Sequence, residues 1–253
     1  MLDARTLVSR DGVTIADVAC RHGRGRGADE EHSRGHAIVF VRRGCFTRSV
    51  NGAESVLDPT RAYCMRPGDE QRYDHPHEHG DDCTAVFLDE DLVAQLPQLP
   101  DGTLNVLPHL DLQHRLLLAA ARRGEDAHEV VEHALELSAA MLERPRALAR
   151  AKLADEAREA LAADWDRSLP DLARHLAVSP HHLSRAFRAE AGHTLARHRM
   201  RLRTRAALER LNGGERNLAR LAADLGFADQ SHLCRVVRSE TGETPSALRR
   251  ALN

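Results

Sequence analysis

An internal repeat in the last hundred residues constrains the fold more than any other feature of the sequence. The first copy, LARHLAVSPHHLSRAFRAEAGHT, covers residues 172–194, and the second, LAADLGFADQSHLCRVVRSETGET, covers residues 221–244. After a one-residue insertion, the matching pairs are Leu183 and Leu233, Arg185 and Arg235, Arg188 and Arg238, Glu190 and Glu240, Gly192 and Gly242, and Thr194 and Thr244. Self-similarity of this kind predicts two copies of one supersecondary unit.

Each copy predicts a helix, a tight turn and a second helix. The turns fall at residues 177–179 and 226–229, after a Leu-Ala-x-x-Leu pattern. Ser179 and Asp229 are favourable N-cap residues, and Pro180 suits the first position of a helix. Such helix pairs fit the major groove of DNA, which admits one helix. We therefore expect the second helix of each copy to face DNA.

The segment between the copies, LARHRMRLRTRAALERL (195–211), predicts one connecting helix. Seventeen residues at 1.5 Å each give about 25 Å. That length is of the order needed to hold two recognition helices one DNA turn apart, roughly 34 Å. The arginines at 197, 199, 201, 203 and 205 alternate around the helix, so only some of them can face one partner.

The charge is divided unequally along the chain. Residues 150–253 hold 19 Lys+Arg and 13 Asp+Glu, a net charge of +6, so the other 149 residues carry −8 of the chain's total of −2. A basic half beside an acidic half indicates that one part binds a polyanion and the other part binds something else.

Residues 150–253 resemble the DNA-binding domain of the AraC/XylS family of bacterial transcription regulators. The resemblance rests on Ser-x-x-x-Leu-Ser-Arg-Ala-Phe (179–187), Gly-His-Thr (192–194), Arg201-Leu202, Gly226-Phe227 and Gly-Glu-Thr-Pro-Ser (242–246). Val237 and Leu248 stand where the family usually has aromatic residues. The family implies base contacts from His181, Ser184, Arg185, Gln230, His232 and Arg235. It implies phosphate contacts from Arg188, Thr194, Arg201 and Ser231.

The N-terminal half predicts short strands, at 38–52, AESVLDP, RAYCMRPGD and 83–89, with turns at Asn51-Gly52 and Pro67-Gly68. Repeated short strands predict a small β-barrel or sandwich. The family resemblance implies a cupin-like sensor and dimerisation domain. We thus expect an α+β two-domain chain, with a cupin-like β-barrel (1–95), a helical linker and dimerisation segment (96–145), and an all-α double helix-turn-helix domain (146–253).

Two segments after the strands have helical periodicity. Apolar residues recur every three and four positions in 111–124 and 127–142, and 147–165 is a further helix. The first two helices are candidates for a homodimer interface. The alternative is that they cover an open face of the barrel.

The stretch HPHEHGDDC (75–83) raises the question of a metal site. On a strand, His75 and His77 would share one face, although Pro76 favours an edge or a loop. With Cys83 and with Cys20 from across the fold, they give Cys and His ligands of the kind that zinc accepts. We take Cys20, His75, His77 and Cys83 as candidate zinc ligands. A thiol redox switch and a polar loop above a pocket for an organic effector remain open as alternatives.

Together these features predict a dimeric, non-enzymatic regulator, such as a transcription activator, that binds promoter DNA and is controlled by a metal, an oxidant or a small molecule. The alternatives are a zinc-thiolate acceptor of methyl groups in DNA repair, or a metal-cupin enzyme fused to a DNA-binding module. The start of the chain has no apolar signal segment and no apolar run approaches ~18 residues, so we expect a cytoplasmic protein without membrane contact. Five widely spaced cysteines are not a secreted disulfide framework.

Overall fold

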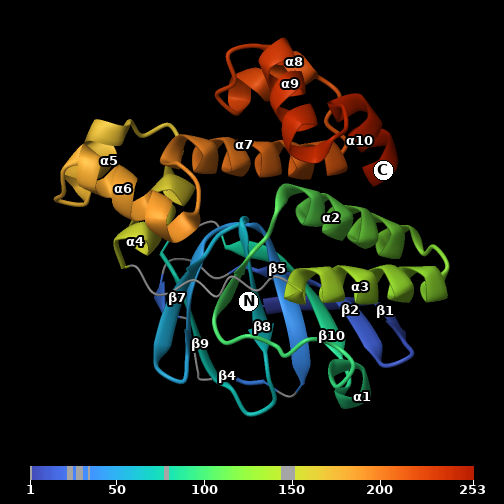
Figure 1. The fold of residues 1–253 in the computed structure, drawn as a ribbon. Coiled ribbons are helices and arrows are strands. Elements are labelled where there is room, and N and C mark those ends of the chain that lie inside the picture. Colours follow the sequence, from blue (N-terminus) through green and yellow to red (C-terminus); the bar gives the residue numbers. More distant parts are fainter. Residues whose placement is uncertain (1, 22–24, 27–30, 34, 77–79, 144–151) are drawn as a thin grey trace.

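A computed structural model describes residues 2–21, 25–26, 31–33, 35–76, 80–143 and 152–253 (Figure 1). The chain forms a strand-rich N-terminal domain and a helical C-terminal domain, as the sequence predicts. The strands make two sheets rather than one closed barrel. None of the described helices is long and apolar enough to cross a membrane.

The larger sheet has six antiparallel strands. Their spatial order is β1 (Leu2–Arg10), β2 (Val13–Cys20), β10 (Asp81–Leu88), β5 (His36–Arg43), β8 (Arg61–Met65) and β11 (Thr103–Asn105). The smaller sheet has the order β3 (Gly25–Arg26), β9 (Glu70–His75), β6 (Phe46–Val50) and β7 (Ala53–Leu57), and β4 (Glu31–His32) also pairs with β9. A short helix, α1 (Glu90–Val93), follows β10.

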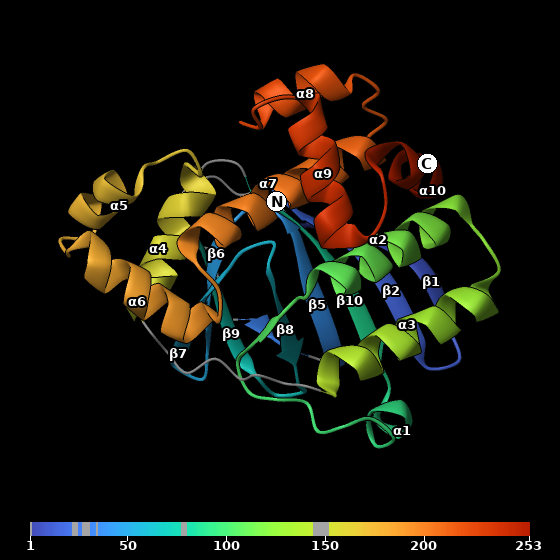
Figure 2. The ribbon, with the colours of Figure 1, turned by 45° about the horizontal axis from the view of Figure 1, so that its top comes forward.

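The larger sheet is buried on both faces, which explains the apolar run at the start of the 38–52 segment. Because strand side chains alternate between faces, Val39 and Val41 of β5 pack toward the smaller sheet, with Phe46 and Tyr63. Ile38 and Phe40 pack on the opposite face beneath two helices, α2 (Pro108–Arg123) and α3 (Ala127–Leu142). Figure 2 shows both helices lying across this sheet.

The covering role of α2 and α3 matches the alternative that the sequence left open. The apolar side chains of α3 join the core of the larger sheet, and α2 also contacts the C-terminal helices α9 and α10. Their apolar stripes are therefore used inside one chain. Homodimer formation stays a prediction, and these stripes no longer support it.

The C-terminal domain contains seven helices within residues 152–253. These are α4 (Lys152–Ala163), α5 (Leu169–His175), α6 (Pro180–Ala191), α7 (Leu195–Asn212), α8 (Leu218–Asp224), α9 (Gln230–Thr241) and α10 (Pro245–Leu252). The helices pack in two apolar clusters, one around Leu183 and Phe187 and the other around Leu233 and Val237. The helix α7 takes part in both clusters.

A buried carboxylate joins the two domains. Asp58, just after β7, is fully buried and accepts hydrogen bonds from the backbone and hydroxyl of Thr60 at 2.7 and 2.6 Å. Its other oxygen accepts a bond from Arg158 of α4 at 3.1 Å and lies 3.4 Å from the ring of His198 of α7. Burial disfavours the charged carboxylate, but Arg158, His198 and Arg61 outweigh this effect and hold the pKa of Asp58 well below its usual value.

A second group of charges joins α7 to the larger sheet and to α2. Glu209 of α7 accepts a bond from Arg115 of α2 at 2.6 Å and lies 3.9 Å from Arg42 of β5. Arg205 of α7 also donates a hydrogen bond to the Val106 carbonyl at 2.8 Å, and its guanidinium lies 3.7 Å from the Asp111 carboxylate. The C-terminal domain is thus held to the N-terminal domain by paired charges at both ends of α7.

We predict that Asp58→Asn strongly destabilises the protein, because it leaves the Arg158 guanidinium buried without its counter-charge. Breaking one member of a buried ion pair costs about 3–5 kcal/mol of unfolding free energy. Urea denaturation followed by circular dichroism measures this loss. As a control, Glu125→Gln removes the exposed pair between Arg123 and Glu125, and its effect should stay below about 1 kcal/mol. Equal effects of the two substitutions would contradict a stabilising role for the Asp58 network.

His114 of α2 predicts a loss of stability in acid. Its ring is fully buried and stacks on Phe40 with centroids 4.5 Å apart. Neither ring nitrogen has a hydrogen-bond partner among the described residues. Burial lowers the pKa of His114 from 6.5 to about 3. Below pH 6.5, His114 is therefore protonated in the unfolded chain but stays neutral in the folded chain. The free energy of unfolding consequently falls as the pH is lowered toward 3.

Replacing His114 by Phe should keep the ring stack on Phe40 and remove the group that takes up a proton on unfolding. The unfolding free energy of His114→Phe should then fall less steeply than that of the wild type, by about 1.4 kcal/mol for each pH unit below 6.5. Urea denaturation at a series of pH values between 7.5 and 4.5 measures both slopes. Parallel curves for the two proteins would show that His114 titrates alike in the folded and unfolded states.

Candidate nucleic-acid interface

Both copies of the sequence repeat form a helix-turn-helix unit. The first unit consists of α5 and α6, and the second of α8 and α9. Ser179 caps α6 by accepting from the backbone of His182 at 3.2 Å, and Asp229 caps α9 by accepting from that of His232 at 2.6 Å. Both second helices end at a glycine in the left-handed region, Gly192 and Gly242. The local signals in the sequence therefore set the start and the end of each second helix.

The connecting helix α7 places the two units at its opposite ends (Figure 1). Its 18 residues correspond to about 27 Å. Arg203, near its centre, donates to the Gly226 carbonyl in the turn of the second unit at 2.9 Å, and also to Asp166 just before the first unit. Arg199 donates to the Arg167 carbonyl. These arginines fix how the two units are oriented relative to each other.

The predicted base-contacting residues lie on α6 and α9. His181, Arg185, Gln230 and Arg235 are exposed, whereas Ser184 and His232 are half-buried. The opposite stripe of each helix is buried in the domain core. His232 is held inside its own unit, because its Nδ1 accepts from the backbone of Ala228 at 3.2 Å and its ring meets Phe227 edge-on. The arginine and glutamine side chains are therefore the best placed to reach base edges.

The four predicted phosphate contacts have different surroundings. Arg188 and Ser231 are exposed on α6 and α9. Thr194 is exposed and caps α7 by accepting from the backbone of Arg197 at 3.2 Å. Arg201 is half-buried, and its Nε lies 3.7 Å from Glu240 of α9. Burial and the neighbouring Arg205 lower the pKa of Arg201. Of the four residues, Arg201 is thus the one already engaged by an internal carboxylate.

The candidate metal ligands of the N-terminal domain are only partly brought together. Cys20 and His75 both contribute to a buried group, and the sulfur of Cys83 lies 3.4 Å from a carboxylate oxygen of Asp81. His77 lies outside the described residues. The sequence interpretation missed Asp81, which is the third member of the group with Cys20 and His75. The acidic pair within HPHEHGDDC was the signal that could have found it.

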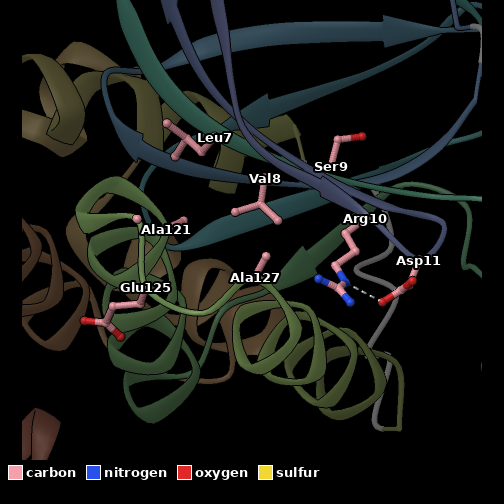
Figure 3. Close-up of a pocket in the computed structure, with 9 residues that line it drawn as sticks. Leu7, Val8, Ser9, Arg10, Asp11, Ala121, Glu125 and Ala127 are labelled. Carbon is pink, nitrogen blue, oxygen red and sulfur yellow. Dashed lines mark hydrogen bonds and ion pairs between the residues drawn. The ribbon is translucent and has the colours of Figure 1, made fainter.

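A hollow of about 680 Å³ lies between the edge strand β1 and the turn that joins α2 to α3 (Figure 3). Its charged lining residues are Arg10, Asp11 and Glu125, all about half exposed. Arg10 donates to Asp11 at 3.0 Å, as the dashed line shows. No cysteine or histidine is among the described residues that line it. The ionisable side chains that line the hollow are therefore exposed rather than buried.

Comparisons with known proteins agree with the C-terminal geometry. Residues 172–251 match the family described as "Helix-turn-helix domain". An 88-residue segment is 33% identical to the regulatory protein PocR of Salmonella typhimurium and covers 35% of this chain and 29% of that relative. Residues 172–251 thus form a helix-turn-helix domain. This domain is of the AraC type, as the sequence resemblance indicated.

Similar solved structures include ToxT from Vibrio cholerae O395, at 10% identity and a TM-score of 0.40, covering 96% of this chain and 98% of that one. The C-terminal domain of AraT, a response regulator from Geobacillus stearothermophilus, has 25% identity and a TM-score of 0.37, covering 40% of this chain and 85% of that one.

The two turns of the repeat differ at one strained position. Ala177 has a φ of 54°, and its counterpart Gly226 has a φ of 69°. A side chain costs about 1–2 kcal/mol in this left-handed region, whereas glycine occupies it freely. A Cβ on Gly226 would also lie 3.0 Å from Asp166 and 3.1 Å from Arg203.

We therefore predict that Ala177→Gly stabilises the domain slightly, by up to about 1 kcal/mol, because relief of strain exceeds the added freedom of the unfolded chain. The matched substitution Gly226→Ala should destabilise it by about 1–2 kcal/mol. Chemical denaturation of the two variants gives both values. Destabilisation by Ala177→Gly would show that Ala177 is not strained.

Proposed function

We propose that this chain is a transcription regulator that binds promoter DNA in a sequence-specific way through its C-terminal domain and responds to an effector through its N-terminal domain. The observation that carries the proposal is the repeated unit, in which Arg185 and Arg188 of α6 recur as Arg235 and Arg238 of α9, all exposed. The net charge of +6 on residues 150–253 suits a polyanionic partner. The family match and the named function of the PocR relative support it.

The exposed side chains divide into two roles. Arg185, Arg235 and Gln230 can make paired hydrogen bonds to guanine or adenine edges, and we assign sequence reading to them. Arg188 and Ser231 lie on the same helices and, with Thr194, are assigned to phosphates, which position the protein without specifying sequence. His181 and Ser184 complete the base-facing set on α6. Arg201 reaches a phosphate only if it leaves Glu240.

The effector is proposed to act through the contact between the domains. A cavity of about 350 Å³ lies there, with Arg42, Arg43 and Gly80 on the N-terminal side and Trp165 and Leu202 on the C-terminal side. A molecule in it touches both domains, and so can favour one arrangement of them over another. A cytoplasmic homodimer that activates or represses transcription remains our expectation for the assembled regulator.

The proposal predicts distinct effects for the two classes of arginine. The preferred DNA sequence is first selected from a random library with the full-length protein, and affinities are then measured by fluorescence anisotropy. Arg185→Ala and Arg235→Ala should each weaken binding to that site by about 1–3 kcal/mol, with little change on unrelated DNA. Arg188→Ala should weaken binding to the selected site and to unrelated DNA. It should also reduce the slope of log affinity against log salt concentration by about one.

Arg10→Ala, which changes an exposed arginine of the N-terminal domain, serves as the control and should leave both affinities unchanged. Selection of no preferred sequence by the folded protein would contradict sequence-specific binding. Wild-type specificity in both the Arg185 and Arg235 variants would show that α6 and α9 are not the recognition helices.

A further inference from the structure

Three strands of the N-terminal domain bring metal-binding side chains to one buried point. Cys20 ends β2, His75 ends β9 and Asp81 begins β10. One donor atom from each of these residues lies within 4.8 Å of the donor atoms of the other two. Their relative exposures are only 6%, 6% and 5%. The point lies where the two sheets meet, because β2 and β10 belong to the larger sheet and β9 to the smaller one.

The register of the strands fixes this group. Asp81 and Cys20 face each other directly across the β10–β2 pair. Gly80 allows the close approach, since its φ is 55° and a Cβ there would lie 2.1 Å from the Cys20 carbonyl oxygen. The neighbouring Asp82 is anchored outward by Arg21 at 2.7 Å and by Arg43 at 2.6 Å. The donors are thus presented by strands, which hold geometry more precisely than loops do.

The donor set suits a borderline divalent cation. A cysteine sulfur, an imidazole nitrogen and a carboxylate oxygen are the three ligand types that zinc accepts, at about 2.0–2.3 Å. Around a tetrahedral ion at these distances, donor atoms lie roughly 3–4 Å apart. Asp81 Oδ1 is now 2.7 Å from His75 Nε2, so a small outward movement of these two groups makes room for an ion.

Charge also favours a cation at this place. Residues 1–149 carry a net charge of −8. The Cys83 thiol, two residues along β10 on the same face as Asp81, lies 3.4 Å from Asp81 Oδ2 and can orient the carboxylate. Partners of this kind, which hold a ligand without touching the ion, contribute to metal affinity in known sites.

We propose that Cys20, His75 and Asp81 bind one zinc-class divalent cation, with Cys83 as the group that positions Asp81. Three protein ligands leave a fourth position open to water or to an incoming ligand. The site lies in the N-terminal domain and stands independently of the proposed DNA-binding function.

The test uses full-length protein freed of metal with a chelator and then titrated with cobalt(II), which gives optical bands, and with zinc in competition. We expect one ion per chain, the visible bands of tetrahedral cobalt and a thiolate-to-cobalt charge-transfer band that zinc abolishes. Cys20→Ser should lose the charge-transfer band. Asp81→Asn, which preserves shape, should weaken binding by at least about tenfold. Cys234→Ser removes a cysteine of α9 in the C-terminal domain, and this variant should bind cobalt and zinc as the wild type does.

Thermal unfolding gives a second readout that also reports whether each variant folds. Excess zinc should raise the midpoint of the wild type and of Cys234→Ser, and leave that of Cys20→Ser unchanged. Where Cys20→Ser does not fold, Asp81→Asn carries the test. Failure of the folded wild type to bind stoichiometric metal, or a thiolate band that persists in Cys20→Ser, overturns the proposal. Since no DNA is present in these assays, neither result bears on the proposed DNA binding.

Discussion

The arrangement of the two domains depends on one buried carboxylate, that of Asp58. It lies in the N-terminal domain, yet its charged partner Arg158 and the neighbouring ring of His198 belong to α4 and α7 of the C-terminal domain. A carboxylate and a guanidinium are costly to remove from water unless each meets the other in good geometry. Separating the domains would therefore leave the Asp58 carboxylate and the Arg158 guanidinium without each other. The same contact packs Arg158 over the ring of Phe187, 5.5 Å from its centroid, so the core of the first helix-turn-helix unit is built against it.

The distribution of arginines on α7 reflects its position between the two domains. Its basic residues lie on all sides, because different faces meet different partners. Arg205 contacts the N-terminal domain, Arg201 the second unit, and Arg199 the segment just before the first unit. A sequence so rich in arginine resembles a DNA-binding stripe, but these three side chains are engaged in internal contacts. In the function that we propose, the surface left for DNA is therefore mainly that of α6 and α9, whose arginines are exposed.

Local signals in the sequence located the helical elements well. The segment expected at 127–142 is α3 residue for residue, and the one at 195–211 is α7 within one residue. N-cap residues, apolar periodicity and the pattern within each copy of the repeat depend on residues close in the sequence. They therefore do not depend on how distant segments pack. Long-range pairing was not accessible in the same way. The order of strands in two sheets, the choice between a covering and a dimerising role for α2, and the meeting of Asp81 with Cys20 across 61 positions all depend on long-range contacts. Cys20 and His75 were singled out by ligand chemistry, whereas Asp81 was missed because aspartates are common.

The proposed metal site and the contact between the domains share a structural connection. Asp82 follows Asp81 on β10 and accepts a bond from Arg43 at 2.6 Å, and Arg43 lines the cavity between the domains. Gly80 and Gly44 also line that cavity, and their backbones touch, since a Cβ on Gly44 would lie 2.5 Å from the Gly80 carbonyl oxygen. The residue before β10 thus lines the same cavity as Leu202 and Glu209 of α7. For a ligand to regulate DNA binding, it must favour one domain arrangement over another. The close approach of Gly44 to Gly80 places the start of β10 directly against this cavity, so a ligand of the proposed metal site would bind next to the contact between the domains.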